Sequence, residues 1–371
     1  MSRQIAPVVV FSTGRCGSTM ISSLLSMHPE VLSLSEAFLL TAPDALQSSW
    51  MSGDEFADLC LVTNPLAVKM IREGMDGDEG VCDFNVPDMR WTKTSIPPII
   101  HASVPHHSPV PERFDAVHDE LEGWLRQQPG RATGDHFRCV FDHLRDRLGR
   151  RVWVERTGGS LTWAAKLVKM FPEARFVHVY RDGRDTALSM LQHPVFRLVA
   201  AALHDMRADR GTVLLRARCR SVMRRFGSVG YLLNPGNPLL RRLVHGMERV
   251  ALRALLETID LRDFVDDAEV TSAHMGWLWN DLVMRGDRVL RGIPAERRLD
   301  VKFEDVQAAP REQLERLIRF IDPSLVDESW LRQASAVPRA ARSSYRTLPE
   351  AEQKQLTEVC RPALELLGYP S

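Results

Sequence analysis

The sequence predicts an α/β fold with a central, mostly parallel β-sheet, and three observations support this prediction. The segment Pro7–Phe11 (PVVVF) is apolar and largely β-branched, as expected of a strand that is buried on both faces. Segments of this kind alternate along the chain with patterns of helical period, which is typical of parallel sheets. The chain has 371 residues, of which 44% are hydrophobic, and this is enough for a large buried core.

Four strand–helix units follow one another along the chain. Each unit combines a short apolar run with a segment in which apolar residues recur every three or four positions. The predicted strands are Pro7–Phe11, Val152–Glu155, Arg175–Tyr180 and Leu299–Phe303, followed by helices near 20–25, 160–171, 186–193 and 304–322, and a closing helix is predicted at 348–369.

Two other segments differ in character. Pro97–Pro111 contains five prolines, which predicts an irregular loop. Residues 201–260 contain eleven arginines, no lysine and five acidic residues among spaced leucines and valines, which predicts a basic helical insertion. We expect a single domain over residues 1–371, with the helical, arginine-rich insertion at about 195–295.

Charge and cysteine usage exclude several classes of protein. Basic and acidic residues are equal in number, 48 of each, so no overall charge attracts the chain to nucleic acid. The six cysteines show no C-x-x-C pair and no metal-finger spacing, as is typical of reduced thiols. No segment approaches the roughly 18 apolar residues of a membrane span. We expect a soluble, cytoplasmic protein whose residues 201–260 could touch a lipid surface.

The turn after the first predicted strand, STGRCGSTM, has the composition of an oxyanion site. A strand that turns through glycines into a helix presents backbone N–H groups and the positive end of the helix dipole. Gly14 and Gly17 allow close approach, Arg15 supplies charge, and Ser18 and Thr19 add hydroxyls. The motif G-x-x-x-x-G-K-[ST] is not matched, because no lysine occupies its place. The turn therefore suits an oxyanion but lacks the usual equipment for magnesium triphosphate.

The run TGRCGSTMISSLLSMHPEVLSLSE resembles the phosphosulfate loop of the sulfotransferases that use 3′-phosphoadenosine 5′-phosphosulfate (PAPS). The resemblance is closest to the branch that contains the tyrosylprotein sulfotransferases and related bacterial enzymes. That branch has a pattern like P-R-S-G-T-T-L, a leucine-rich helix, H-P and a glutamate. The matching residues here are Arg15, Gly17, Ser18, Thr19, His28, Pro29 and Glu36, which stands 21 positions after Arg15. Gly14 and Cys16 depart from the usual proline and serine.

Two further segments strengthen the resemblance. In FVHVYRDGRDTALSM, Arg181 and Ser189 are eight residues apart and resemble the family's clamp for the 3′-phosphate of the donor. An arginine fork and a hydroxyl can hold a terminal phosphate dianion, which ATP lacks at its 3′ position. In VERTGGSLTWAAKLVKMFPEARF, Arg156 stands at the family's basic position, and Gly158 replaces the usual proline.

The resemblance implies a three-layer αβα fold with a P-loop-like turn and a helical cap. It implies PAPS as the donor, adenosine 3′,5′-bisphosphate (PAP) as the product, and no metal. The sulfuryl group would pass to a hydroxyl of an unidentified acceptor, which could be a small molecule, lipid, sugar or peptide tyrosine. Glu36 is the candidate base, and Arg15 and Arg156 are the candidate catalytic cations. The candidate donor-binding residues are Arg15, Cys16, Gly17, Ser18, Thr19, Arg181 and Ser189.

Other interpretations stay open at this point. A nucleotide-dependent, kinase-like enzyme and a non-catalytic nucleotide-binding protein are the alternative functions. His136 or His143, seven residues apart on one predicted helical face, could act as a base in place of Glu36. Trp277 or Trp279 could stack on adenine, although packing is the more common role of such residues.

Overall fold

The structure is a computed structural model in which most of the chain is described. The described residues are 5–41, 44–47, 49–63, 65–75, 90–92, 94–103, 114–207, 260–266, 270–339 and 343–371.

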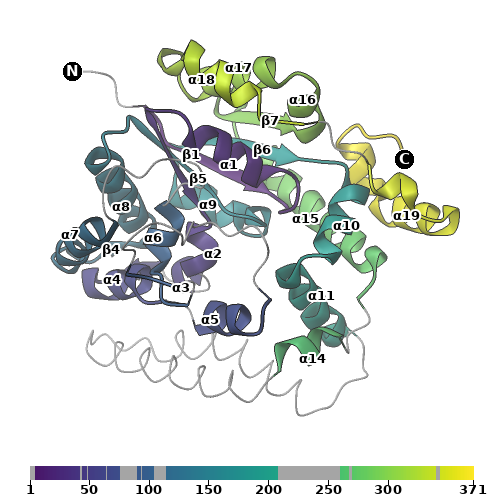
Figure 1. The fold of residues 1–371 in the computed structure, drawn as a ribbon, viewed down its shortest axis with the longest axis horizontal. Coiled ribbons are helices and arrows are strands. Elements are labelled where there is room, and N and C mark those ends of the chain that lie inside the picture. The colour runs from purple at the N-terminus through teal and green to yellow at the C-terminus, as the bar shows by residue number, and fades with distance from the viewer. Residues whose placement is uncertain are drawn as a thin grey trace.

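Five parallel strands form the central sheet, in the order β2-β5-β1-β6-β7 (Figure 1). The strands are β1 (Val8–Ser12), β2 (Val31–Ser35), β5 (Val152–Arg156), β6 (Arg175–Tyr180) and β7 (Arg298–Lys302). β1 is the central strand, since Val10 aligns with Arg156 on one side and with Val177 on the other. All five residues of β1 are buried, as predicted for a strand covered on both faces.

The helices surround this sheet and bury its two faces. They are α1 (Ser18–Ser26), α2 (Ala37–Thr41), α3 (Asp44–Gln47), α4 (Gly53–Leu61), α5 (Pro65–Arg72), α6 (Pro98–Ser103), α7 (Phe114–Arg126), α8 (Thr133–Arg147), α9 (Ala164–Met170), α10 (Gly183–Leu191), α11 (Pro194–Arg207), α14 (Leu261–Asp266), α15 (Ser272–Leu290), α16 (Phe303–Ala308), α17 (Pro310–Ile321), α18 (Glu328–Ser335) and α19 (Glu350–Leu366). A small antiparallel pair, β3 (Trp50–Met51) and β4 (Arg131–Ala132), lies apart from the main sheet.

Alternation along the strands divides the core into two layers. Val8 and Val10 of β1 face the cluster that contains α1, α17 and α18, whereas Val9 and Phe11 face the cluster that contains α2, α4, α6, α8 and α9. Figure 1 shows these two groups of helices on opposite sides of the sheet. The predicted three-layer αβα arrangement is therefore confirmed. A third cluster joins α10, α15 and α19 beside the sheet.

Several predicted elements need correction. The segment at 97–111 was expected to be an irregular loop, but its described part contains the helix α6, which Pro98 begins. Proline is well tolerated in the first turn of a helix, so this composition does not exclude one. The single helix expected at 304–322 is two helices, α16 and α17, divided before Pro310. The strand β2 was not among the predicted strands, although its alternating VLSLS pattern is typical of a strand.

Most of the predicted arginine-rich insertion, residues 208–259, lies outside the described residues. The described helices at the two ends of this segment, α11 and α14, contact each other. Helix α15, which falls in the predicted range of the insertion, packs on α10 and α19 of the main body.

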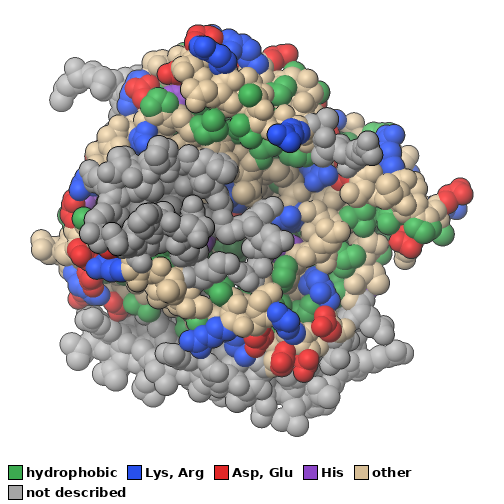
Figure 2. Space-filling view, in the orientation of Figure 1, with side chains coloured by type: hydrophobic (Ala, Val, Ile, Leu, Met, Phe, Trp, Pro, Cys, Tyr) green, Lys and Arg blue, Asp and Glu red, His purple; other side chains and the backbone are tan. Residues whose placement is uncertain are grey.

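The surface and the cysteines agree with the balanced composition. Acidic and basic side chains are interspersed over the face shown in Figure 2. Within the described parts of the chain, no helix combines the length and the apolar character that a membrane crossing requires. Four described cysteines, Cys16, Cys60, Cys139 and Cys360, are free thiols.

Candidate functional site

The carboxyl ends of the five parallel strands bring the candidate residues to one edge of the sheet. Arg15 lies in the turn after β1, Glu36 directly follows β2, and Arg156 is the last residue of β5. Arg181 directly follows β6, and Phe303 directly follows β7. Parallel strands end on the same side of a sheet, and ligands of open α/β folds bind there. Residues up to 288 positions apart in the sequence thus share one edge.

The turn after β1 has the backbone of an anion-binding nest. Gly14, Arg15 and Gly17 have positive φ angles of 78°, 56° and 86°. Turns that mix left-handed and right-handed residues can direct several backbone N–H groups toward one point. Helix α1 begins directly after Gly17, and this N-cap residue has no side chain with which to cap the helix. The positive end of the helix dipole therefore points at the turn.

Gly14 and Gly17 have positive φ angles, and close neighbours also leave no room for a side chain at either position. A Cβ on Gly17 would lie 2.0 Å from Cδ2 of Phe303, and a Cβ on Gly14 would lie 2.4 Å from Cζ of Phe196. Proline cannot adopt the φ of Gly14, since its ring holds φ near −65°. These contacts give the physical reason for glycine at position 14 in this chain. They also identify Phe196 and Phe303 as neighbours of the turn, which the sequence analysis did not single out.

The side chain of Arg15 crosses from the first turn to the third strand–helix unit. Its Nε donates to Oγ of Ser189 in α10 at 3.1 Å, across 174 positions of sequence. Ser189 therefore contacts Arg15, whereas the sequence analysis expected it beside Arg181. Ser18 and Thr19 lie in the first turn of α1, with Ser18 buried and Thr19 half-buried.

Cys16 is turned away from the expected anion site. Its thiol is fully buried in the apolar cluster under the turn and donates to the carbonyl oxygen of Val179 at 3.2 Å. Burial raises the pKa of this thiol. Of the groups of Cys16, only the backbone N–H is therefore suited to a role in holding an anion.

Arg181 lies against the same aromatic ring that packs on the first turn. Its guanidinium carbon is 5.0 Å from the centroid of Phe303, whose edge meets Gly17. The turn after Arg181 is well anchored: the Asp182 side chain accepts from the Arg184 N–H at 2.9 Å, and the Asp182 N–H donates to Glu304 at 3.0 Å. The C-terminal Tyr369 hydroxyl donates to the other oxygen of Glu304 at 2.8 Å.

Glu36 and Arg156 form a buried ion pair. The side chains are 15% and 3% exposed, and Nη1 of Arg156 donates to Oε1 of Glu36. The N–H of Gly158 donates to Oε2 of Glu36 at 3.0 Å, and the N–H of Glu36 donates to the carbonyl of Arg156 at 2.8 Å. Nε of Arg156 is buried with no hydrogen-bond partner among the described residues. A buried donor without a partner is unusual in proteins and calls for an explanation, such as a catalytic role or a bound water.

Backbone conformation also marks two of the candidate residues. Among the described residues, Arg15 and Glu36 are the two non-glycine residues with positive φ, at 56° and 60°. This conformation costs roughly 1–2 kcal/mol for a residue with a Cβ. Such strain is concentrated at functional sites, where the surrounding structure holds it in place.

Glu155 lies next to this pair but on the other face of β5. Side chains alternate along a strand, so Glu155 enters the core while Arg156 faces Glu36 and Ser35. Oγ1 of Thr157 donates to the Glu155 carboxyl group at 2.5 Å. Burial raises the pKa of Glu155 to about 8. Arg156 therefore pairs with Glu36, 120 positions away in the sequence, and not with its neighbour Glu155.

The raised pKa of Glu155 predicts a loss of stability with rising pH. An acid whose pKa is raised by folding binds its proton more strongly in the folded state, so the folded state is fully favoured only below the unfolded pKa. Between pH 5 and about 8 the melting temperature should fall by roughly 5 °C more in the wild type than in Glu155→Gln. Thermal melts of both proteins across this range test the prediction, and parallel pH profiles would contradict it.

The other candidate residues have packing roles. Nε2 of His136 bonds the carbonyl of Met51 at 2.9 Å and its ring stacks on Phe56, while His143 stacks on Trp124. Trp279 is fully buried, with its ring on Gly183 at the start of α10. Trp277 is partly buried against the cluster of α10, α15 and α19.

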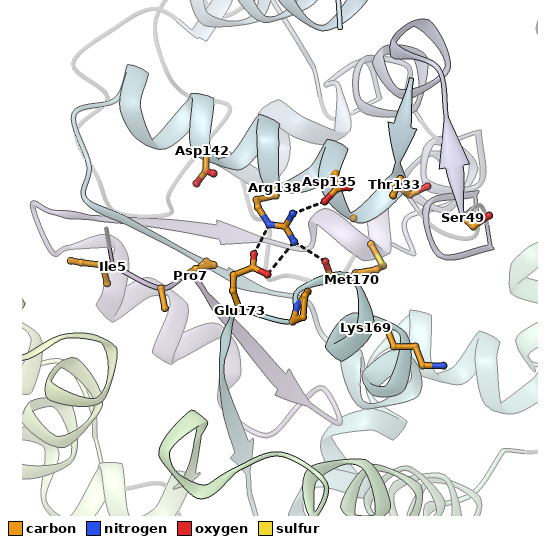
Figure 3. A pocket seen from close by; sticks show the side chains of 14 residues that line it. Ile5, Pro7, Ser49, Thr133, Asp135, Arg138, Asp142, Lys169, Met170 and Glu173 are labelled. Atoms are coloured by element: carbon orange, nitrogen blue, oxygen red, sulfur yellow. Dashed lines mark hydrogen bonds and ion pairs between the residues drawn. The ribbon is translucent and has the colours of Figure 1, made fainter. Parts of the chain in front are cut away.

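A cavity of about 820 Å³ lies at the opposite edge of the sheet (Figure 3). Pro7 and Glu173, which line it, precede β1 and β6 and therefore mark the amino ends of these strands. Figure 3 shows Arg138 in the middle, bonded to Asp135, Glu173 and the carbonyl of Met170. This cavity contains none of the candidate residues at the carboxyl edge.

Comparison with family models identifies one family. The model of the sulfotransferase family matches residues 7–227. Among solved structures, the chain is similar to a sulfotransferase domain from the curacin biosynthetic pathway, at 12% identity and a TM-score of 0.47, with 100% of this chain and 99% of that chain covered. It is also similar to the sulfotransferase domain of the Synechococcus PCC 7002 olefin synthase, at 14% identity and a TM-score of 0.44, with 100% and 98% covered. No curated protein sequence matches the chain. The family match spans the candidate residues from Arg15 to Ser189.

Proposed function

The chain belongs to the sulfotransferase family, and on this basis we propose that it transfers a sulfuryl group from PAPS to the hydroxyl of an acceptor. The observation that carries the proposal is the meeting of two distant turns. Arg15 bonds Ser189 at 3.1 Å, and Phe303 contacts both Gly17 and Arg181. One ligand with two anionic ends could therefore contact both turns at once.

The chemistry of these residues fits PAPS. The donor carries a phosphosulfate at one end and a 3′-phosphate at the other, and it supplies the sulfuryl group. The left-handed glycines, the N-terminus of α1 and Arg15 suit the phosphosulfate. Arg181 suits the 3′-phosphate, since its guanidinium is a rigid fork of donors. Arg156 supplies one more cation at the same edge, and its Nε has no hydrogen-bond partner among the described residues.

Each residue has a distinct role in this proposal. Glu36 accepts the proton of the acceptor hydroxyl, because a carboxylate within hydrogen-bond reach can act as a general base. Arg15 and Arg156 stabilise the negative charge that develops on the transferred group and on the departing phosphate. Gly158 holds one oxygen of Glu36 through its N–H and thereby orients the carboxylate. Gly17, Ser18 and Thr19 bind the 5′-phosphosulfate through the start of α1, to which Cys16 contributes its backbone N–H.

A comparison of three nucleotides tests the proposal. PAP, 5′-AMP and ATP differ in the phosphate at the 3′ position, which PAP alone carries. A ligand that binds only the folded state raises stability by RT ln(1 + [L]/Kd), so a 100-fold excess over Kd adds about 2.7 kcal/mol. We expect PAP to raise the melting temperature by several degrees and 5′-AMP and ATP to have little effect. Equal shifts for the three nucleotides would contradict PAPS as the donor.

Removal of Arg181, in the turn after β6, should abolish the preference for PAP over 5′-AMP. Arg181→Ala is expected to weaken PAP binding at least tenfold, because a charge-assisted contact with phosphate contributes about 1.5–3 kcal/mol. Binding of 5′-AMP should not change. Arg319→Ala is the matched control, since Arg319 is a half-exposed arginine of α17 paired with Glu315. Unchanged PAP affinity in Arg181→Ala would remove this residue from the donor site.

The alternative functions give different results in the same assays. A kinase-like enzyme would be stabilised by ATP with magnesium and would release ADP. A non-catalytic nucleotide-binding protein would bind PAP but release none from PAPS with any acceptor.

A panel of phenols, sugars, lipids and tyrosine peptides, assayed with PAPS that carries a radiolabelled sulfuryl group, would identify the acceptor.

A further inference from the structure

A row of buried serine hydroxyls leads from Arg156 to helix α1. Ser22 in α1 and Ser33 and Ser35 in β2 are only 4–5% exposed. Nη2 of Arg156 donates to Oγ of Ser35 at 3.4 Å, and this Oγ lies 2.7 Å from Oγ of Ser22. Oγ of Ser22 lies 2.9 Å from Oγ of Ser33, which donates to the carbonyl oxygen of Ser22 at 2.9 Å.

The two ends of this row determine the direction of every bond in it. A guanidinium only donates, a carbonyl only accepts, and each serine hydroxyl has one proton. Ser33 uses its proton on the carbonyl of Ser22 and therefore accepts from the Ser22 hydroxyl. Ser22 then has no proton left for Ser35, so Ser35 donates to Ser22 and offers its lone pairs to Arg156. All bonds in this chain of hydrogen bonds therefore donate in the same direction, from the Arg156 guanidinium toward Ser33.

We propose that Ser35 and Ser22 are positioning residues, which hold the Arg156 guanidinium for sulfuryl transfer and connect it to the helix of the donor turn. This inference rests on the proposed function. Hydrogen bonds in a chain polarise one another, and a positive charge at the donor end reinforces them. Glu36 holds Nη1 and Ser35 holds Nη2, so two corners of the planar group are fixed and Nε keeps one direction.

The place of this chain of hydrogen bonds in the fold shows how it could hold Arg156 in position. Arg156 ends β5, Ser35 ends the neighbouring strand β2, and Ser22 lies one turn into α1, which begins after Gly17. The chain of hydrogen bonds therefore joins β5, β2 and α1, which carry Arg156, Glu36 and the donor turn. A misplacement of about 1 Å in a catalytic group can lower a rate about 100-fold.

Turnover measurements test this inference. Ser35→Ala and Ser22→Ala are each expected to lower kcat about tenfold, with the Kd for PAP within about twofold of the wild-type value. In an Arg156→Ala background the same substitutions should change kcat less than about twofold, because no guanidinium is left to position. Release of PAP from PAPS is measured with the best acceptor of the panel, or with water.

Ser26→Ala is the matched control. Ser26 lies in the same helix, is 7% exposed, and donates to the carbonyl of Ser23 at 2.7 Å, outside the chain to Arg156. It should keep the wild-type kcat. Wild-type kcat in both Ser35→Ala and Ser22→Ala would overturn the inference. So would a tenfold loss of kcat that the serine substitutions still cause in the Arg156→Ala background, because the serines would then only join α1 to β2. A different result would contradict the proposed function, namely equal binding of PAP and 5′-AMP by the wild-type protein.

Discussion

Glu36→Gln should lower kcat by about 10²–10⁴-fold while the Kd for PAP stays within about threefold of the wild-type value. Glutamine keeps the shape of the side chain but cannot accept a proton from the acceptor hydroxyl. It also removes the negative charge opposite Arg156, whose side chain is 3% exposed. Breaking such a pair is expected to reduce the free energy of unfolding by about 3 kcal/mol. Release of PAP and thermal melts measure the two effects separately.

A second carboxylate, at the other end of β2, provides the control for this substitution. Glu30 precedes β2 and pairs with Arg151, which precedes β5, so this pair lies at the opposite ends of the same two strands. Both of its side chains are 39% exposed, and exposed pairs contribute about 0–1 kcal/mol. Glu30→Gln should therefore leave kcat unchanged. A Glu36→Gln protein that retains more than a tenth of the wild-type kcat would show that Glu36 is not the base.

Arg156→Ala should lower kcat by about 10²–10³-fold, since loss of one donor to a developing oxyanion costs about 2.7–4 kcal/mol. Arg156→Lys should recover only part of this loss, because a lysine ammonium lacks the planar fork that reaches Glu36 and Ser35 together. The Kd for PAP should rise by less than tenfold, because Arg15 and Arg181 remain. Steady-state rates and PAP titrations of the two variants give these quantities.

The control is again at the other end of the strand. Arg151→Ala removes an exposed arginine that pairs with Glu30 and donates to Ser324, and it should leave both kcat and PAP binding unchanged. If Arg156→Ala keeps a kcat within threefold of the wild type, Arg156 has only a structural role as the partner of Glu36.

Local patterns predicted the parts of this protein that depend on neighbours in sequence. The apolar run of β1, the strand at Arg175–Tyr180 and the helices that follow these two strands were predicted from composition and period, and the structure confirms them. The family assignment rested on motifs of the same local kind, and the family match confirms it. The assignment of Glu36, Arg15, Arg156 and Arg181 to roles at the site remains a prediction until the variants are measured.

Contacts between distant segments were not predictable in this way. The strand β2, which places Glu36 at the edge of the sheet, has a recognisable pattern, but its position beside β5 depends on the strand order. The pair of Glu36 with Arg156 joins residues 120 positions apart, and the contact of Arg15 with Ser189 spans 174. Cys16 illustrates the same limit, because its neighbours in sequence suggest a ligand and its burial against Val179 shows a core residue.

Sequence alone was enough for the α/β class, the glycine turn after β1 and the family, because strand and helix periods and glycine turns are set by interactions within a few residues. Tertiary structure decided which charges meet, which side chain of the turn is buried, and how the serine hydroxyls connect Arg156 to α1. The physical reason is that hydrogen bonds and ion pairs act over about 3 Å, and only the order and register of the strands bring residues far apart in the chain within that distance.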